Sequence, residues 1–98
     1  MQNDIKVRIG DDFNIKLEGS PMSGYIWEIL LTNENSKLVK LKDTYSDIDK
    51  SLVGAPAVQT FVFKTLSVGS LALTFRYRRP WEKGNYLEDR TFCIEIVH

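Results

Sequence analysis

Apolar and polar residues alternate with a period of two along most of this 98-residue chain, and this period constrains the fold more than any other feature. An alternating segment gives a β-strand one apolar face, and no segment here sustains the spacing of an amphipathic helix. The alternation marks seven segments: residues 5–9, 13–17, 25–31, 37–42 (the weakest), 61–63, 71–77 and 92–97. Residues 43–59 are expected to form a long excursion between strands.

About seven strands with one apolar face each predict an all-β fold, an antiparallel β-sandwich of two facing sheets. The residues expected to face inward include Phe13, Ile15, Leu17, Leu71, Leu73, Phe75, Phe92, Ile94 and Ile96. A chain of this length makes one domain, residues 1–98, that can bury a modest core without metals or disulfides. The paired cysteines of an antibody domain are absent from the sequence, so the sandwich is expected to be Ig-like in shape only.

The overall composition excludes several classes of function. Lys and Arg total 13 and Asp and Glu total 13, so no net field attracts nucleic acid or an anionic membrane. No apolar run approaches the roughly 20 residues that cross a bilayer, and the first residues show no secretory leader. We therefore expect a cytoplasmic monomer, or a lysosomal, vesicular or secreted one if a leader has been removed.

Residues that commonly carry catalysis are scarce. His98 is the single histidine and the last residue, and Cys93 is the single cysteine. Because no histidine lies near it in sequence, Cys93 is expected to be a small, half-buried strand residue rather than a nucleophile. One histidine and one cysteine cannot build a zinc site, and no glycine-rich phosphate loop is present in the sequence. The sequence thus predicts neither an enzyme nor a cofactor or metal site.

Arginines alternate with aromatic residues in FRYRRPWEK, residues 75–83, and such a segment can stack on nucleic-acid bases. Arg76 and Arg78 alternate with the core-type Phe75 and Tyr77, however, so we assign them to the solvent face of a strand. The neutral charge balance also argues against nucleic acid as a partner. A nucleic-acid reader is therefore a minor alternative.

Three connections between strands carry stiff or small residues. In SPMSGY, residues 20–25, the proline fixes φ and the glycine permits a positive φ, so the turn has a defined shape. In RRPWEKGNY, residues 78–86, the proline ends a strand and leaves Trp81 either as a cap over the sandwich or as a contact for a partner. Residues 20–25 follow the second expected strand and residues 78–86 follow the sixth, and these two connections emerge at the same end of such a sandwich. GAPA, residues 54–57, precedes the fifth strand and can lie beside them at that end. Three stiff loops at one end predict a preorganised binding surface.

These motifs resemble the chagasin family of proteinaceous cysteine-peptidase inhibitors over most of the chain. The family's first loop, Asn-Pro-Thr-Thr-Gly-Tyr followed by x-Trp, is matched by residues 20–25 and Trp27, with Met22 in place of a threonine. Its last loop, Arg-Pro-Trp, is matched in full by residues 79–81, and GAPA resembles a reduced form of its glycine-rich middle loop. The segment DRTFCIEI also resembles the family's final strand.

The resemblance implies reversible, tight-binding inhibition of papain-like (cathepsin-like) cysteine peptidases, whose active-site cleft is occluded by three loops, residues 20–25, 54–57 and 79–86. The first loop would cover the catalytic cysteine and histidine, and the other two would contact the rims, without a covalent bond, metal or cofactor. The implied peptidase-binding residues are Ser20, Pro21, Met22, Ser23, Gly24, Tyr25, Gly54, Ala55, Pro56, Ala57, Arg79, Pro80 and Trp81. The alternative is an Ig-like adhesion or scaffold module that binds another protein through the same loops.

Overall fold

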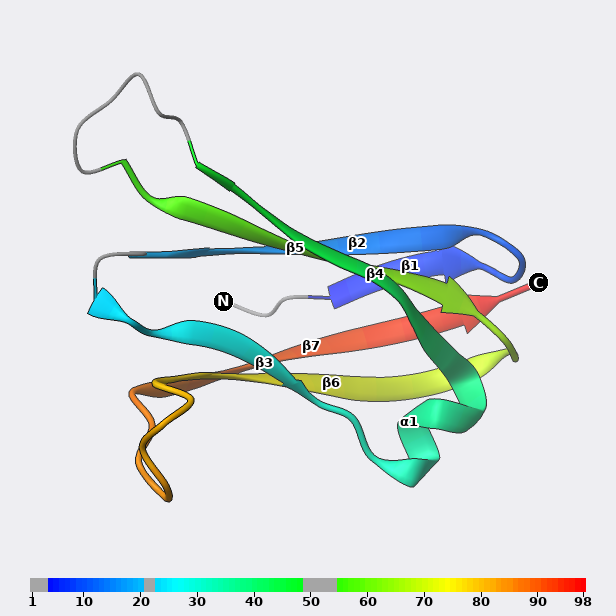
Figure 1. Cartoon of the computed structure of the whole chain (residues 1–98). Helices are drawn as coiled ribbons and strands as arrows, with labels where there is room; N and C mark the ends of the chain where they lie inside the picture. The colour runs from blue at the N-terminus through cyan, green and yellow to red at the C-terminus, as the bar shows by residue number, and fades with distance from the viewer. Residues whose placement is uncertain (1–3, 21–22, 49–54) are drawn as a thin grey trace.

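Two β-sheets packed face to face make up the computed structural model, which describes residues 4–20, 23–48 and 55–98 (Figure 1). The elements are β1 (Asp4–Arg8), β2 (Asp12–Gly19), β3 (Ile26–Leu30), α1 (Asn33–Leu38), β4 (Val39–Ile48), β5 (Ala57–Thr65), β6 (Gly69–Arg78) and β7 (Glu88–Val97). One sheet has the strand order β1-β7-β6-β3 and the other the order β2-β5-β4. The predicted Ig-like sandwich is therefore confirmed.

The core lies between the two sheets and is built from the alternating residues. Phe63, Leu73 and Phe75 are fully buried, and the predicted inward positions on β2, β6 and β7 all belong to the core or pack against it. Ring contacts cross the interior, since Phe75 lies 4.9 Å from Phe61 and 6.3 Å from Phe63 between ring centroids. Burial of this many apolar side chains is the main force that holds the sheets together.

One strand pair is parallel, whereas an antiparallel sandwich was expected. β1 runs parallel to β7, and the pairing extends from Asp4 opposite Cys93 to Arg8 opposite Val97. After β1 the chain passes through a turn at Gly10, whose φ is +94°, and enters the other sheet as β2. Parallel neighbours need a long crossover, and the rest of the chain supplies it. Alternation carries no information about strand direction, so the sequence could not show this.

Residues 31–48 differ most from the sequence expectation. A short helix, α1, replaces the start of the strand predicted at 37–42, and β4 then continues to Ile48 through part of the predicted excursion. The helix has six residues, too few to show a helical period. Residues 43–48 of β4 are exposed on both faces, so they carry no alternating pattern. At the far side of the excursion, residues 57–59 already belong to β5, and residues 49–54 lie outside the described part of the chain.

Smaller corrections concern single residues. Cys93 is exposed rather than half-buried, because it points outward from β7 between the inward-facing Phe92 and Ile94. Tyr25 precedes β3 instead of starting it, and Leu31 lies just beyond its end and is exposed. Within residues 4–20, 23–48 and 55–98, no helix is long and apolar enough to cross a membrane. The same residues bring together no group of three His, Cys, Asp or Glu side chains suited to a metal ion.

Candidate functional site

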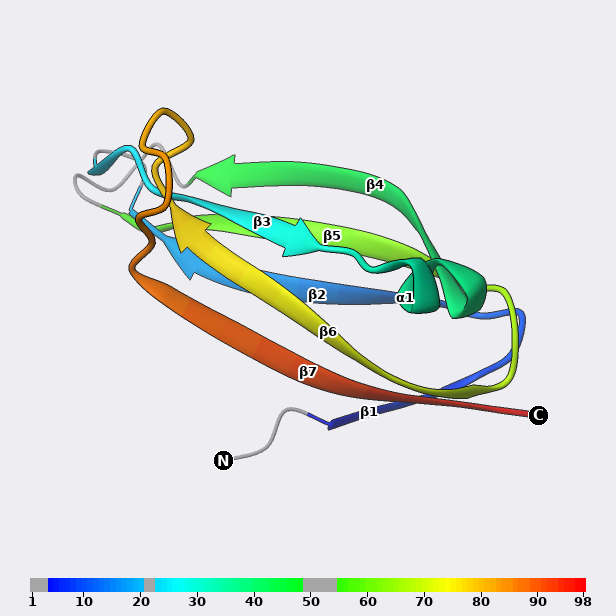
Figure 2. The same ribbon diagram turned by 90° about the horizontal axis from the view of Figure 1, so that it is seen from below.

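Strand pairing brings the three predicted loops to one end of the sandwich (Figures 1 and 2). Ala57, where the middle loop enters β5, is paired with Gly19 of β2 on one side and with Ile48 of β4 on the other. In the facing sheet, Ile26 of β3 is paired with Arg78 of β6, so the first and last loops leave neighbouring strands. We call this end the loop edge; among the described residues it comprises residues 20, 23–25, 55–57 and 79–87.

The first loop is closed by its own serines. The hydroxyl and the backbone N–H of Ser23 both donate to the carbonyl oxygen of Ser20, at 2.7 and 3.2 Å. The same hydroxyl accepts from the N–H of Tyr25 at 3.3 Å, and Gly24 between them has a φ of +80°. A positive φ is readily adopted only by glycine, which explains its place in the turn. The predicted site residues Pro21 and Met22 lie outside the described residues.

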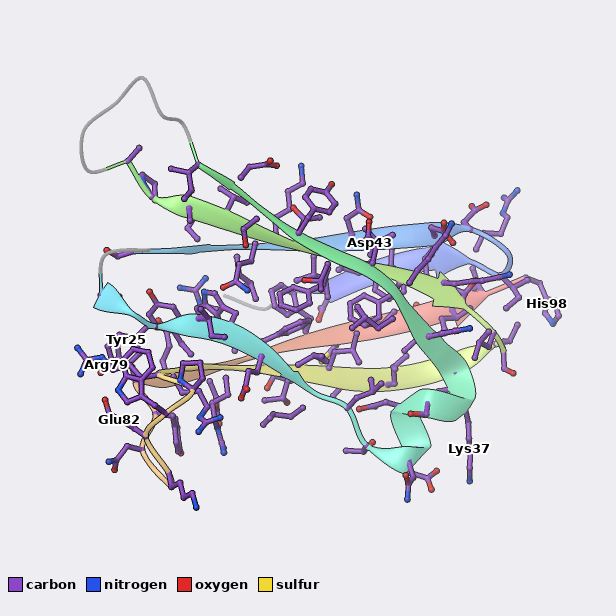
Figure 3. The ribbon with its side chains drawn as sticks, in the orientation of Figure 1. Tyr25, Lys37, Asp43, Arg79, Glu82 and His98 are labelled. Atoms are coloured by element: carbon purple, nitrogen blue, oxygen red, sulfur yellow. The ribbon has the colours of Figure 1, made fainter. Side chains whose placement is uncertain are left out.

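The last loop is folded back by two arginines around Glu82. The N–H of Glu82 donates to the carbonyl of Arg79 at 3.1 Å, and the side chains of the two residues form an ion pair at 3.1 Å. Arg78 donates to the carbonyl of Glu82 at 2.8 Å and pairs with Glu28 of β3 at 3.0 Å. Figure 3 shows Arg79 and Glu82 together at this end, beside Tyr25. These contacts give the loop a fixed shape without burying it in the core.

Described residues of the first and last loops touch each other directly. Arg79 Nε donates to the carbonyl oxygen of Ser23 at 3.1 Å, which joins the two turns. The indole of Trp81 lies against Gly24, so closely that a Cβ atom on that glycine would meet the ring's Cη2 atom at 2.5 Å. Trp81 is nevertheless 69% exposed, so it does not cap the core. Trp81 is thus an exposed indole held in place by a neighbouring loop, and exposed aromatic residues of this kind are common in binding surfaces.

A column of stacked side chains runs inward from the loop edge. The Arg79 guanidinium lies 4.6 Å from the ring centroid of Tyr25, which stacks on Tyr77 at 5.2 Å. Tyr77 in turn stacks on Trp27 at 4.6 Å, and the Arg90 guanidinium lies over that indole at 5.1 Å from the ring centroid. Each such contact contributes about 0.5–1.5 kcal/mol beyond area burial. The column therefore ties the turn residue Tyr25 to the buried core.

Tyr77 also holds the start of the first loop through its hydroxyl. The phenol oxygen accepts a hydrogen bond from the backbone N–H of Ser20 at 2.9 Å, across the two sheets. Gly19 makes this approach possible, because a Cβ atom there would lie 2.9 Å from the same oxygen. A side chain at position 19 would thus displace either the tyrosine or the loop.

The predicted site residues are brought together only in part. Those of the first and last loops that the structure describes, residues 20, 23–25 and 79–81, form the connected surface set out above. Of the middle loop, Ala57 is the first residue of β5, Ala55 is partly buried and Pro56 is exposed. Gly54 lies outside the described residues. The expected meeting of the first and last loops is therefore confirmed, and the middle loop adjoins them through the pairing of Ala57.

Sequence reasoning missed the residues that hold the loops from behind. Tyr77 has the pattern of a core residue, and nothing in the alternation marks its hydroxyl as a loop contact. The alternation correctly places Arg78 on the solvent face of its strand, but it does not indicate the bond from Arg78 to the Glu82 carbonyl oxygen. Gln59 of β5, which bonds both backbone groups of Trp27, carries no sequence signal at all. Such long-range contacts become visible only once the strands are paired.

The arginines near the loop edge are neutralised by carboxylates. Arg76 of β6 forms two hydrogen bonds with Asp89 of β7, at 2.9 and 3.0 Å, and its guanidinium also lies 3.9 Å from the Tyr86 ring centroid. The hydrogen bond from Arg76 lowers the pKa of Asp89, and the same bond raises the pKa of Arg76. Arg90 pairs with Glu88 at 3.2 Å. This pairing leaves little positive charge for phosphates, which argues against nucleic-acid binding.

Comparison with known proteins identifies similar chains. The family model described as Chagasin family peptidase inhibitor I42 matches residues 6–96. Amoebiasin-2 of Entamoeba histolytica is 29% identical over 93 residues, covering 94% of this chain and 76% of that protein. Chagasin of Trypanosoma cruzi is 24% identical over 89 residues, covering 88% of this chain and 81% of that protein.

A similar fold is found among solved structures. The crystal structure of the cysteine protease inhibitor EhICP2 from Entamoeba histolytica matches with a TM-score of 0.80 at 26% identity. The match covers 97% of this chain and 86% of that chain. The similarity in sequence and the similarity in fold thus extend over nearly the same residues.

Proposed function

The chain belongs to the chagasin family of peptidase inhibitors, whose model matches residues 6–96, and we propose that it inhibits papain-like cysteine peptidases by inserting the loop edge into their active-site cleft. The solved relative EhICP2 is itself a cysteine protease inhibitor, which supports a cysteine peptidase as the target. Binding is reversible and involves no covalent bond. The protein acts as an inhibitor and not as an enzyme.

One observation carries this proposal: the first and last loops are joined to each other before any partner is present. Arg79 bonds Ser23, and Trp81 rests on Gly24, so the described residues of the two loops form one connected surface. Binding usually costs the freedom of the loops that become ordered in the interface. The contacts that already join residues 23–24 to Arg79 and Trp81 reduce that cost, which suits a tight inhibitor.

Occlusion requires only shape and contacts from this chain. In the arrangement that we propose, residues 20–25 lie over the catalytic cysteine and histidine of the peptidase, and residues 54–57 and 79–86 contact the two rims. Such an interface buries on the order of 800 Å² on each partner. The apolar Trp81 and the neutralised Arg79 provide contact area without placing an unpaired charge in a desolvated cleft.

The nucleophile in this proposal belongs to the peptidase alone. Cys93 lies five positions along β7 from Glu88, about 17 Å at the rise of a strand, and faces outward from the sheet. It is therefore too far from the loop edge to form a disulfide with a catalytic cysteine seated there. Reduction is accordingly expected to leave inhibition unchanged.

Titration of papain with the purified chain tests the proposal. We expect loss of activity at a molar ratio near one, full recovery on dilution, and an inhibition constant below about 1 µM, which corresponds to about −8 kcal/mol of binding energy. Mass spectrometry of the mixture should recover the chain uncleaved. No inhibition at a tenfold molar excess over micromolar papain would contradict the proposal and favour a binding module with a different partner.

A further inference from the structure

The backbone of Trp27 lies on an unpaired edge of the four-stranded sheet. β3 is the last strand of that sheet, and among the strands of the described residues it is paired with β6 alone. Trp27 is buried, with 2% of its surface exposed, so water cannot easily satisfy the N–H and C=O groups that point away from β6. An open strand edge in this position needs a partner from elsewhere in the fold.

That partner is the side chain of Gln59, which comes from β5 in the opposite sheet. Its Oε1 accepts from the N–H of Trp27 at 2.7 Å, and its Nε2 donates to the carbonyl oxygen of Trp27 at 3.2 Å. The carboxamide thus takes the place that a peptide group of a further strand would occupy. Two bonds to one residue fix both the distance between the strands and their relative shift.

The location of this contact relates it to the loops. Trp27 lies two residues after Tyr25 of the first loop, and Gln59 lies two residues after Ala57 of the middle loop. The Trp27 indole also donates to the carbonyl of Glu18 in β2 at 3.1 Å, so the other sheet holds both its side chain and its backbone. Any movement of Gln59 would therefore be transmitted to the strand ends that carry two of the three loops.

From this geometry we infer that Gln59 is a positioning residue of the loop edge, one that sets the spacing between the first and middle loops that a peptidase cleft meets. The inference rests on the proposed function, because the spacing matters only if both loops enter one cleft. Gln59 itself need not contact the peptidase, since it acts through Trp27 and β5.

Gln59→Glu keeps the shape of the side chain, removes the donor to the Trp27 carbonyl oxygen and adds a negative charge at neutral pH. At neutral pH the carboxylate can accept from the Trp27 N–H, but it has no proton to donate and faces the Trp27 carbonyl oxygen with like partial charge. A carboxyl group normally titrates near pH 4.3, and a carbonyl neighbour raises that value. Acidic buffer should therefore restore the donor and with it the contact.

Thr65 offers a matched control on the same strand at the opposite end. Its hydroxyl accepts from the N–H of Gly10 at 2.8 Å and donates to the carbonyl of Asp11 at 3.0 Å. Like Gln59, it joins backbone groups that lie far away in the sequence, but it is remote from the loops. Thr65→Val removes both bonds at nearly constant volume, so it reports the effect of lost stability alone.

The test measures inhibition of papain by the parent, Gln59→Glu and Thr65→Val at about pH 7.5 and at about pH 4.5. We expect Gln59→Glu to weaken inhibition at least about tenfold at neutral pH, mainly through slower association, and less than about threefold in acid. Thr65→Val should stay within about twofold of the parent at both pH values, although its melting temperature falls. The inference would be overturned if the two variants lost equal inhibitory strength. It would also be overturned if the weakening in Gln59→Glu were the same at both pH values.

Hydrogen exchange without peptidase separates this inference from the proposed function. The Ser23 amide, which bonds the Ser20 carbonyl within the first loop, should exchange at least about fivefold faster in Gln59→Glu than in the parent and at the parent's rate in Thr65→Val. If papain is not inhibited by the parent, the proposed function fails while this measurement still decides the role of Gln59. An unchanged Ser23 exchange rate in Gln59→Glu would refute that role.

Discussion

Among single residues, Trp81 combines high exposure with a fixed position. Its indole is 69% exposed and rests on Gly24, while most other exposed apolar side chains project from strands or from the opposite end. Exposed tryptophans that become buried on binding often contribute a large share of the binding energy. The contact with Gly24 restricts the orientation of the indole in the free protein, so less side-chain entropy is lost on binding.

Trp81→Ala should therefore weaken inhibition of papain about thirtyfold or more, which corresponds to about 2 kcal/mol of binding energy. The melting temperature should change little, because the ring is not part of the core. Leu66→Ala, an exposed apolar residue at the opposite end, is the control and should leave the inhibition constant unchanged. If Trp81→Ala unfolds the protein instead, the indole is a cap over the sandwich.

Gly24 is the second residue whose identity the loop edge requires. Alanine there would adopt a φ of +80° at a cost of about 1 kcal/mol and would also drive its Cβ into the Trp81 ring. We expect Gly24→Ala to weaken inhibition more than about tenfold, because the indole must move. Gly10→Ala carries the same backbone strain at φ +94° with no atom within 4 Å, so it should lower the melting temperature and leave inhibition intact. Equal inhibition by the two variants would show that the Trp81–Gly24 contact is irrelevant to binding.

At the scale of elements, β6 and β7 are joined close to the last loop by the Arg76–Asp89 pair. The hydrogen bond lowers the pKa of Asp89 in the folded protein, so the pair stabilises the fold above the carboxyl's ordinary titration near pH 4. That contribution is lost as the pH falls through the lowered pKa. It is small, because about a third of each side chain is exposed.

Asp89→Asn should accordingly melt at a lower temperature than the parent at pH 7, and the two melting temperatures should converge as the pH falls below about 4. The measurement is a series of thermal melts between neutral and strongly acidic pH. Asp47→Asn, at an exposed position on β4, should follow the parent throughout. A gap between Asp89→Asn and the parent that persists unchanged in acid would mean that the pair does not stabilise the fold.

Helix α1 depends on one of its own residues, the buried Asn35. The Asn35 carboxamide accepts from the N–H of Thr32 at 3.2 Å and donates to the carbonyl of Ala72 at 3.2 Å, while the Asn35 N–H donates to the Thr32 hydroxyl at 3.1 Å. Asn35→Ala should lower the free energy of unfolding by about 1–2 kcal/mol, because the Asn35 half of the capping box and the bond to Ala72 are lost together, while the N-cap bond of Thr32 remains. Asn33→Ala, on the exposed side of the same helix, should cost less. Since α1 lies at the end opposite the loop edge (Figure 1), neither change should alter inhibition.

The elements that could be predicted from the sequence are those with one buried face. β2, β6 and β7 alternate because their inner residues meet the opposite sheet. The second half of β4 has no buried face, and α1 is shorter than two helical turns. Neither element therefore produces a periodic pattern of apolar residues in the sequence. The parallel pairing of β1 with β7 depends on which sheet each strand joins, which local pattern does not encode.

For the molecule as a whole, the sandwich explains why loops far apart in sequence meet. Three features lie at the same end of the sandwich (Figure 2): the last residues of β2, the residues of β4 and β5 that flank their connection, and the turn from β6 to β7. This part of the candidate site was predictable, because the motifs and the Ig-like topology together fix where the loops emerge. The contacts of Tyr77 and Gln59 that hold them were not, because they depend on side-chain directions across two sheets.

The central claim is that the loop edge occupies the active-site cleft of a papain-like peptidase, and protection of the catalytic thiol tests it most directly. The measurement is the rate at which iodoacetamide alkylates the catalytic cysteine of papain, with and without one equivalent of the chain, and with Trp81→Ala and Leu66→Ala as paired variants. We predict that the parent and Leu66→Ala slow alkylation at least about tenfold and that Trp81→Ala protects less at the same concentration. Alkylation at the free enzyme's rate in a mixture that is demonstrably complexed would contradict the claim, because the chain would then bind away from the cleft.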